Sequence, residues 1–285
     1  MGARYFGLVQ FVSLIFNNPA QGSVVFTLGF PLDRVLHDCL HSQLLGTGKT
    51  ANGSAIVYLA EVGFFGAFPQ HGLYSDSLAI VLRQAHLHFF RWKKEHGLQA
   101  SQPRFTPARL ARKTRMNYPV LSSKGIPSKV VTFWIANCCV EHASRAEATD
   151  LDRLVATCLH SYANSLRTMD TAGLILTEQE GESYYRSVMQ HLLSYAALHS
   201  KSRAAVRREP NRTSWLLLCK HHHFMHHGKT VRVERLNPRM SQLLSAEDWV
   251  GRIGRIARAC HKTSVSLRTL ERYLALVYLE LLKLK

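Results

Sequence analysis

The stretch Ala148–Met169, which reads ATDLDRLVATCLHSYANSLRTM, indicates the fold class of this chain. Its apolar side chains recur every three or four positions, as at Leu151, Val155, Leu159 and Leu166. This spacing places side chains on one face of an α-helix. The stretch therefore predicts an amphipathic helix that buries one face in a core.

The same spacing recurs along most of the chain. It predicts further helices at Ser54–Phe65, Ser75–His96, Thr106–Arg115, Ser128–Ala143, Thr177–Leu198, Thr213–His227, Ser245–His261 and Ser264–Lys283. Two residue pairs have the spacing of a helix-starting capping box, Thr177 with Glu180 and Ser245 with Asp248. Gly97 and Gly228 lie where helices are expected to stop.

The segment Val24–Leu28 is the best strand candidate, because it is rich in β-branched residues and lies between two turn signals. We therefore expect a mainly α (α+β) protein, a helical domain with a small N-terminal sheet. Composition divides the chain into residues 1–50, a helical region at 51–199 and basic helices at 200–285, within one domain overall. Gln99–Pro127 and Ser200–Arg212 are expected to be exposed connectors.

The charge of this 285-residue chain is strongly positive, with a formal net charge of +17 and a sequence pI near 10.0. Residues 81–130 hold eleven Lys or Arg and one acid, and residues 201–285 hold eighteen and six. Such blocks favour a polyanionic partner, DNA or RNA, although two solvated surfaces would give the same count. The expected phosphate contacts are Arg83, Arg91, Lys93, Lys94, Arg109, Arg112, Lys113, Arg115, Arg207, Arg208, Arg252, Arg255 and Arg258, with Trp92, Trp249 and Tyr273 as stacking partners.

Two short motifs suggest other chemistry. Gly46–Thr50 matches the end of a phosphate-binding P-loop, but Gln43 stands where the loop needs its first glycine, so we do not expect an NTPase. His222 and His226 form an i,i+4 pair within a histidine-rich segment, and two imidazoles at that spacing can hold one metal ion. Zinc needs further ligands, so the segment is also explained as a polyhistidine helix that faces phosphate. The six cysteines show neither disulfide-framework nor zinc-ribbon spacing.

Several motifs resemble a known family. Asp38–His41 followed by Leu44–Gly46 resembles the segment around the second catalytic aspartate of CACTA-type (DDE) cut-and-paste transposases. Lys220–His226 is similar to their Lys-x-His-x-x-x-His segment, and the helix with Glu247 resembles the one that carries their third acid. Large uncharacterised algal protein families share this order, including a stretch like Pro119–Lys124.

The resemblance implies an RNase H-like fold, of which this chain would keep a degenerate remnant. It also implies a two-metal site for phosphodiester cleavage, with Asp38 as one ligand and Glu247 or Asp248 as another. The first aspartate of that site is missing, because no residue before Asp33 is acidic. Asp38 and Asp248 also have a structural explanation, since each sits where it would cap a helix.

From these observations we expect a transposase-derived nucleic-acid-binding protein without catalytic activity. The alternatives are a metal-dependent nuclease that uses Asp38 and Glu247, and a non-enzymatic helical interaction protein. We expect no obligatory cofactor, Mg²⁺ only in an active nuclease, and no zinc. No apolar run is long enough to span a membrane, and the protein is expected to be intracellular and nuclear, with a signal peptide at residues 1–20 as the alternative.

Overall fold

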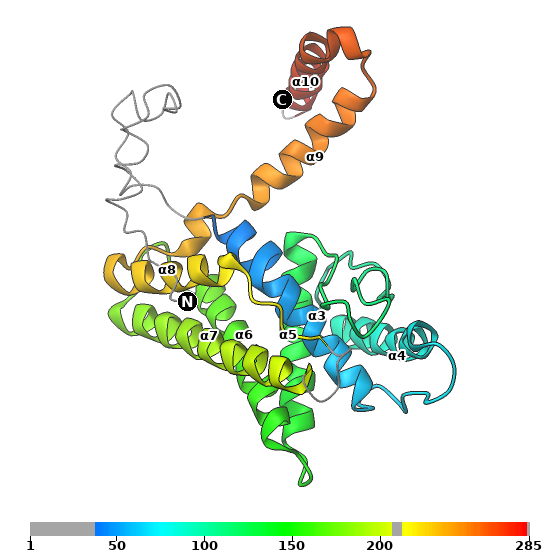
Figure 1. The fold of residues 1–285 in the computed structure, drawn as a ribbon. Coiled ribbons are helices and arrows are strands. Elements are labelled where there is room, and N and C mark those ends of the chain that lie inside the picture. The colour runs from blue at the N-terminus through cyan, green and yellow to red at the C-terminus, as the bar shows by residue number, and fades with distance from the viewer. Residues whose placement is uncertain (1–37, 207–212, 284–285) are drawn as a thin grey trace, which may run out of the picture. The chain divides into compact units, whose positions relative to one another are not determined.

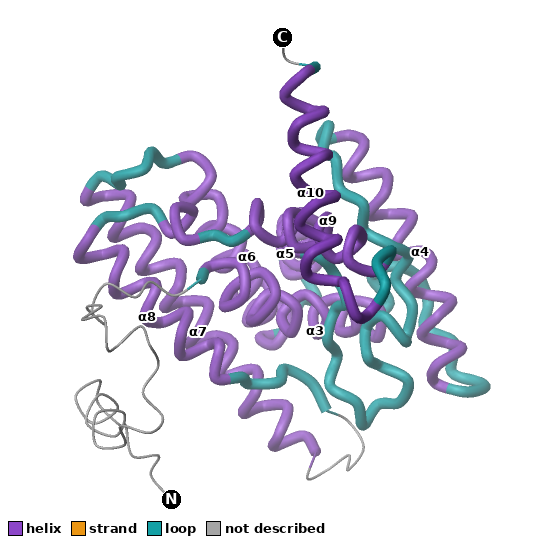
Figure 2. The backbone as a smooth tube through the Cα atoms, turned by 90° about the horizontal axis from the view of Figure 1, so that it is seen from above, coloured by secondary structure: helices purple, strands orange, loops and turns teal. Residues whose placement is uncertain are grey.

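The computed structural model describes residues 38–206 and 213–283, and these residues form helices and loops (Figures 1 and 2). The helices in chain order are η3 (Leu40–Thr47), α3 (Gly48–Glu61), α4 (Tyr74–Glu95), α5 (Gly125–Ala143), α6 (Asp150–Thr171), α7 (Glu178–Val206), α8 (Cys219–Glu234), η4 (Pro238–Ser241), α9 (Leu244–Arg258), η5 (Lys262–Ser264) and α10 (Val265–Leu282). Within the described residues there is no strand, and one isolated antiparallel bridge joins Ile175 to Leu236.

The expected mixed α+β class, with an RNase H-like remnant, is therefore wrong. An RNase H-like domain needs a central sheet to carry its carboxylates, whereas the segment with Asp38 leads directly into η3 and α3. The predicted strand Val24–Leu28 lies outside the described residues. What remains of the expectation is a mainly helical protein.

Helix α6 lies at the centre of the packing and contacts α5 on one side and α7 on the other (Figure 1). Its buried residues include Val155, Leu159, Tyr162 and Leu166, which follow the three- and four-residue spacing of the sequence. Thr149 starts the helix with a capping box, in which its side chain accepts a hydrogen bond from the backbone N–H three residues on. Burial of this apolar face is the main stabilising term of the helix.

Two groups of buried side chains make up the core. The larger one lies among α3, α4, α5 and α6 around Trp134, which is fully buried and stacks on Phe105 with ring centroids 5.5 Å apart. The second lies among η3, the end of α6, α7 and α8, and contains Tyr162, Tyr184 and Phe224. Aromatic side chains of this size contribute much of the apolar area that such a core removes from water.

Helix α3 is buried on nearly every side, and the first part of the helix consists mostly of small residues, which allows close packing. A Cβ atom on Gly48 would lie 2.7 Å from the Tyr162 hydroxyl, and one on Gly53 would lie 2.9 Å from the backbone nitrogen of Leu121. Glycine is therefore needed at both positions for close packing. The P-loop-like stretch Gly46–Thr50 is part of this buried helical segment and forms no phosphate loop.

Helix ends agree with the sequence signals in part. The capping box of Thr177 with Glu180 is present, with hydrogen bonds in both directions, and α4 ends just before Gly97, whose φ is +62°. Gly228 does not end a helix but lies inside α8, where a Cβ atom would sit 3.0 Å from Val188. Ser200–Arg212 is not a connector throughout, because α7 continues to Val206.

Candidate nucleic-acid interface

The loop between α4 and α5, residues 96–124, has a fixed path although it forms no helix. The helix predicted at Thr106–Arg115 is wrong, because this segment contains only turns. Phe105 inserts into the core, where it is 3% exposed. The backbone nitrogen of Leu121 donates to the carbonyl oxygen of Lys49 at 3.0 Å. The loop is therefore attached to the helices at several points.

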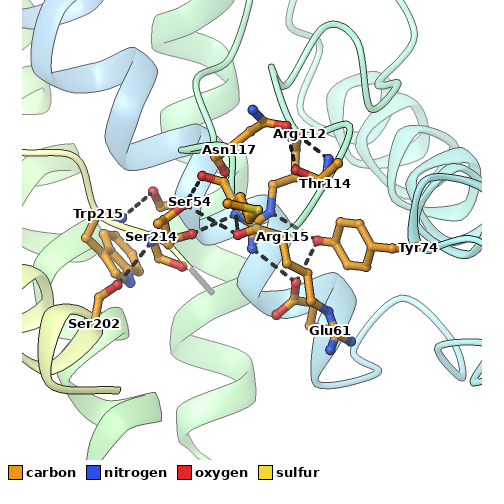
Figure 3. Close-up of polar contacts among 12 residues, drawn as sticks. Ser54, Glu61, Tyr74, Arg112, Thr114, Arg115, Asn117, Ser202, Ser214 and Trp215 are labelled. Carbon is orange, nitrogen blue, oxygen red and sulfur yellow. Dashed lines mark hydrogen bonds and ion pairs between the residues drawn. The ribbon is translucent and has the colours of Figure 1, made fainter. Parts of the chain in front are cut away.

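Arg112 is the central anchor of this loop (Figure 3). Its side chain is fully buried, and Nη1 donates to the backbone oxygens of Arg115 and Thr213, each at 2.7 Å, and to that of Asn117. Thr213 begins the segment that leads into α8, so one guanidinium group joins two segments about a hundred residues apart. A buried charge of this kind persists only when it is paired with an opposite charge and held by hydrogen bonds.

The charge of Arg112 is balanced inside the protein. Its Nη2 atom lies 3.6 Å from Oε1 of Glu61, and its Nε atom donates to the Tyr74 hydroxyl at 3.1 Å. The Tyr74 hydroxyl in turn donates to Oε1 of Glu61 at 2.7 Å (Figure 3). Burial, together with the charge of Glu61, raises the pKa of Tyr74 well above its usual value. Arg112 was expected to contact phosphate, but its side chain is buried and its charge is paired with Glu61 inside the protein, so it is not part of the exposed cationic surface.

The outer surface of the same region is basic. On α4, the residues Arg83, Arg91 and Lys94 are exposed, and their spacing of eight and three places them along one side of the helix. The loop beside α4 adds four exposed cations, Arg104, Arg109, Lys113 and Arg115. We call these seven residues the basic surface. Figures 1 and 2 show the loop running beside α4.

The cations of the basic surface have no acidic partners among the described residues. Elsewhere ion pairs neutralise surface cations, as for Lys129 with Asp170 and Arg186 with Glu182. Arg115 instead lies over the Tyr74 ring, 5.1 Å from its centroid. Lys93 differs from its neighbours on α4, because its ammonium group donates to the carbonyl oxygen of Ala100 and it is only partly exposed. A cationic surface without internal neutralisation attracts polyanions.

The other expected contacts lie elsewhere in the chain. Arg255 and Arg258 are exposed on α9, and Arg252 on the same helix is partly exposed. Arg207 and Arg208 lie outside the described residues. Among the expected stacking residues, Trp92 packs against the larger core group and stacks on His96 with ring centroids 4.4 Å apart.

Asp38 acts as a helix cap. Its carboxylate accepts hydrogen bonds from the backbone nitrogens of Leu40 at 2.9 Å and His41 at 3.1 Å, and it pairs with the His41 ring. Partial burial favours the neutral acid, but the hydrogen bonds from His41, Leu40 and Leu243 outweigh it and lower the pKa of Asp38. The alternative explanation of Asp38 as a cap is therefore confirmed.

Asp38 also meets the start of the helix that carries Glu247. The backbone nitrogen of Leu243, one residue before α9, donates to Oδ1 of Asp38 at 3.2 Å. The side chains of Glu247 and Asp248 lie outside the described ones, so a shared metal site stays a prediction. Among the described residues, no group of three or more His, Cys, Asp or Glu side chains is arranged to hold a metal ion.

The histidine-rich segment lies on α8 and is divided between surface and core. His222 and His226 face one another, with 3.0 Å between their Nε2 atoms. His221 is buried against Tyr195, and burial lowers its pKa to about 4. His227 is buried and lies 3.0 Å from the Ser42 hydroxyl on η3. The segments around Asp38 and His221 are thus in contact, and His221 and His227 contribute to the packing between helices.

In comparisons with known proteins, no family model, curated protein or solved structure matched this chain. The resemblance to cut-and-paste transposases stays a prediction. In the part of the chain that is described, no helix has the length and apolar character needed to cross a membrane.

Proposed function

We propose that this protein binds nucleic acid through the basic surface, the seven exposed cations of α4 and the following loop. The observation that carries the proposal is that these side chains have no acidic partners among the described residues, whereas Arg112 beside them is neutralised internally. Phosphate oxygens are the natural partners of such cations, and they supply most of the affinity in nucleic-acid binding.

The rigidity of the platform supports the proposal. Arg112 fixes the path of the loop, and α4 is anchored through buried residues such as Leu82 and Phe89. Arg83 and Lys94 are eleven residues apart on α4 and therefore about 16 Å apart along the helix axis. This length spans about five phosphates at the strand rise of about 3.4 Å. Cations on an ordered backbone require less loss of backbone entropy on binding than cations on a mobile loop.

The experiment compares two double variants with the same net charge. Arg91→Gln/Lys94→Gln removes two cations of the basic surface, and Arg153→Gln/Arg186→Gln removes two cations that pair with acids on α6 and α7. We expect the first variant to bind a labelled oligonucleotide about tenfold more weakly and the second to bind as the wild type does. Equal weakening by both variants would show that net charge alone drives binding and would contradict a defined surface.

A further inference from the structure

A cavity of about 270 Å³ opens between α4 and the loop that follows it. Helix α4 contributes residues three and four positions apart, which form one wall, and three consecutive loop residues form the other. The lining residues are Ala79, Arg83, His86, Leu87, Arg104, Phe105 and Thr106. Two members of the basic surface therefore border a hollow.

The inner part of this cavity is aromatic and uncharged. Phe105 is buried, and its ring meets the His86 ring edge-on with centroids 5.3 Å apart. Burial and the nearby charges of Arg104 and Lys93 lower the pKa of His86 and thereby favour its neutral imidazole. The Nδ1 atom of His86 is buried and has no hydrogen-bond partner. A lining of imidazole, aliphatic and aromatic side chains suits a planar heterocycle better than an anion.

The rim of the cavity is cationic. Arg83 and Arg104 are exposed, come from opposite walls and form no ion pair with an acid among the described residues. A ligand with a flat ring for the inner part of the cavity and a negative charge on each side of that ring would fit both the uncharged lining and the cationic rim. A nucleotide within a strand has this arrangement, because each base lies between two phosphates.

We propose that this cavity receives one unpaired nucleobase of a single-stranded nucleic acid, with the flanking phosphates on Arg83 and Arg104. The inference rests on the proposed function and deepens it, because it selects single strands over duplex. In a duplex the bases are stacked and paired, so inserting one costs the energy of flipping it out. A single strand offers its bases freely, and aromatic side chains commonly accept them.

The test uses the full chain and three labelled ligands of about 12 nucleotides, within the usual site size of single-strand binders. They are single-stranded DNA of mixed sequence, the matching duplex, and an abasic strand with the same number of phosphates. Ala79→Phe fills the mouth of the cavity and changes no charge, since Ala79 is exposed and lines the opening. Ala196→Phe, at an exposed position of α7, is the matched control. Thermal melting checks that both variants fold.

We expect the wild type to bind the single strand at least about fivefold more tightly than the abasic strand or the duplex. Ala79→Phe should abolish this preference and leave abasic binding unchanged, while Ala196→Phe should keep it. Equal affinity for all three ligands, unchanged by Ala79→Phe, would overturn the base pocket and leave the proposed function standing. No binding to any ligand would overturn both. A free mononucleotide that competes as well as the strand would overturn the strand assignment in favour of a nucleotide site.

Discussion

Arg112→Met tests how the basic loop is held in place. The variant keeps an apolar stem of similar length but removes the donors that bind the backbone oxygens of Arg115, Asn117 and Thr213. It also removes the positive charge beside Glu61, whose side chain is only 9% exposed. Removing one partner of a buried ion pair typically costs about 3–5 kcal/mol. We expect a loss of that size in the free energy of unfolding.

The measurement is urea unfolding followed by circular dichroism, with Arg109→Met as the matched control. Arg109 lies on the same loop with an exposed side chain, so its loss should change the unfolding free energy by less than about 0.5 kcal/mol. The double variant Arg112→Met/Glu61→Gln should recover part of the loss, because the remaining buried group is then neutral. An unfolding free energy for Arg112→Met within about 1 kcal/mol of the wild type would refute this role of the buried pair.

Three further variants test the packing of the helices. Burial lowers the pKa of His191 from 6.5 to about 3, so stability present above pH 6.5 is lost as the pH falls towards 3. At about pH 5 the free energy of unfolding should be about 2 kcal/mol lower than above pH 6.5 because of this group. His191→Gln should remove this contribution from unfolding curves measured across pH. An unchanged pH dependence in the variant would contradict the burial of a neutral His191. Gly53→Ala should lower the free energy of unfolding by about 1–3 kcal/mol, because the added Cβ atom would lie 2.9 Å from the backbone nitrogen of Leu121. The control is Gly251→Ala, whose Cβ atom would have no neighbour within 4 Å and should not destabilise the protein. Asp38→Ala should lower the free energy of unfolding by about 0.5–2 kcal/mol, because the helix loses its capping hydrogen bonds. A melting temperature equal to that of the wild type would contradict this capping role.

The sequence predicted the helices whose structure depends on local pattern. Helix α4 lies within one residue of its expected bounds, and α5 and α6 within three. The spacing of apolar residues was sufficient to predict these three helices, because each of them buries one face. The capping box at Thr177 and the helix end at Gly97 could also be predicted from the sequence, since both depend on residues close by in the chain.

Tertiary contacts decided the features that the sequence did not reveal. Gly228 looked like a helix end, but Val188 needs the space that a side chain would fill. Arg112 looked like a surface cation, and only the fold brings Glu61 close enough to neutralise it. Nothing in the sequence indicated the proposed cavity at His86, because its second wall includes Phe105, from a loop next to a segment that was expected to be a helix.

The salt dependence of binding tests the basic surface most directly. The affinity of the full chain for a single-stranded oligonucleotide is measured across a series of salt concentrations. If most of the seven exposed cations contact phosphate, the logarithm of the association constant should fall with the logarithm of salt concentration with a slope of about −4 to −5. A slope near zero would contradict the account, because binding would then not depend on phosphate contacts.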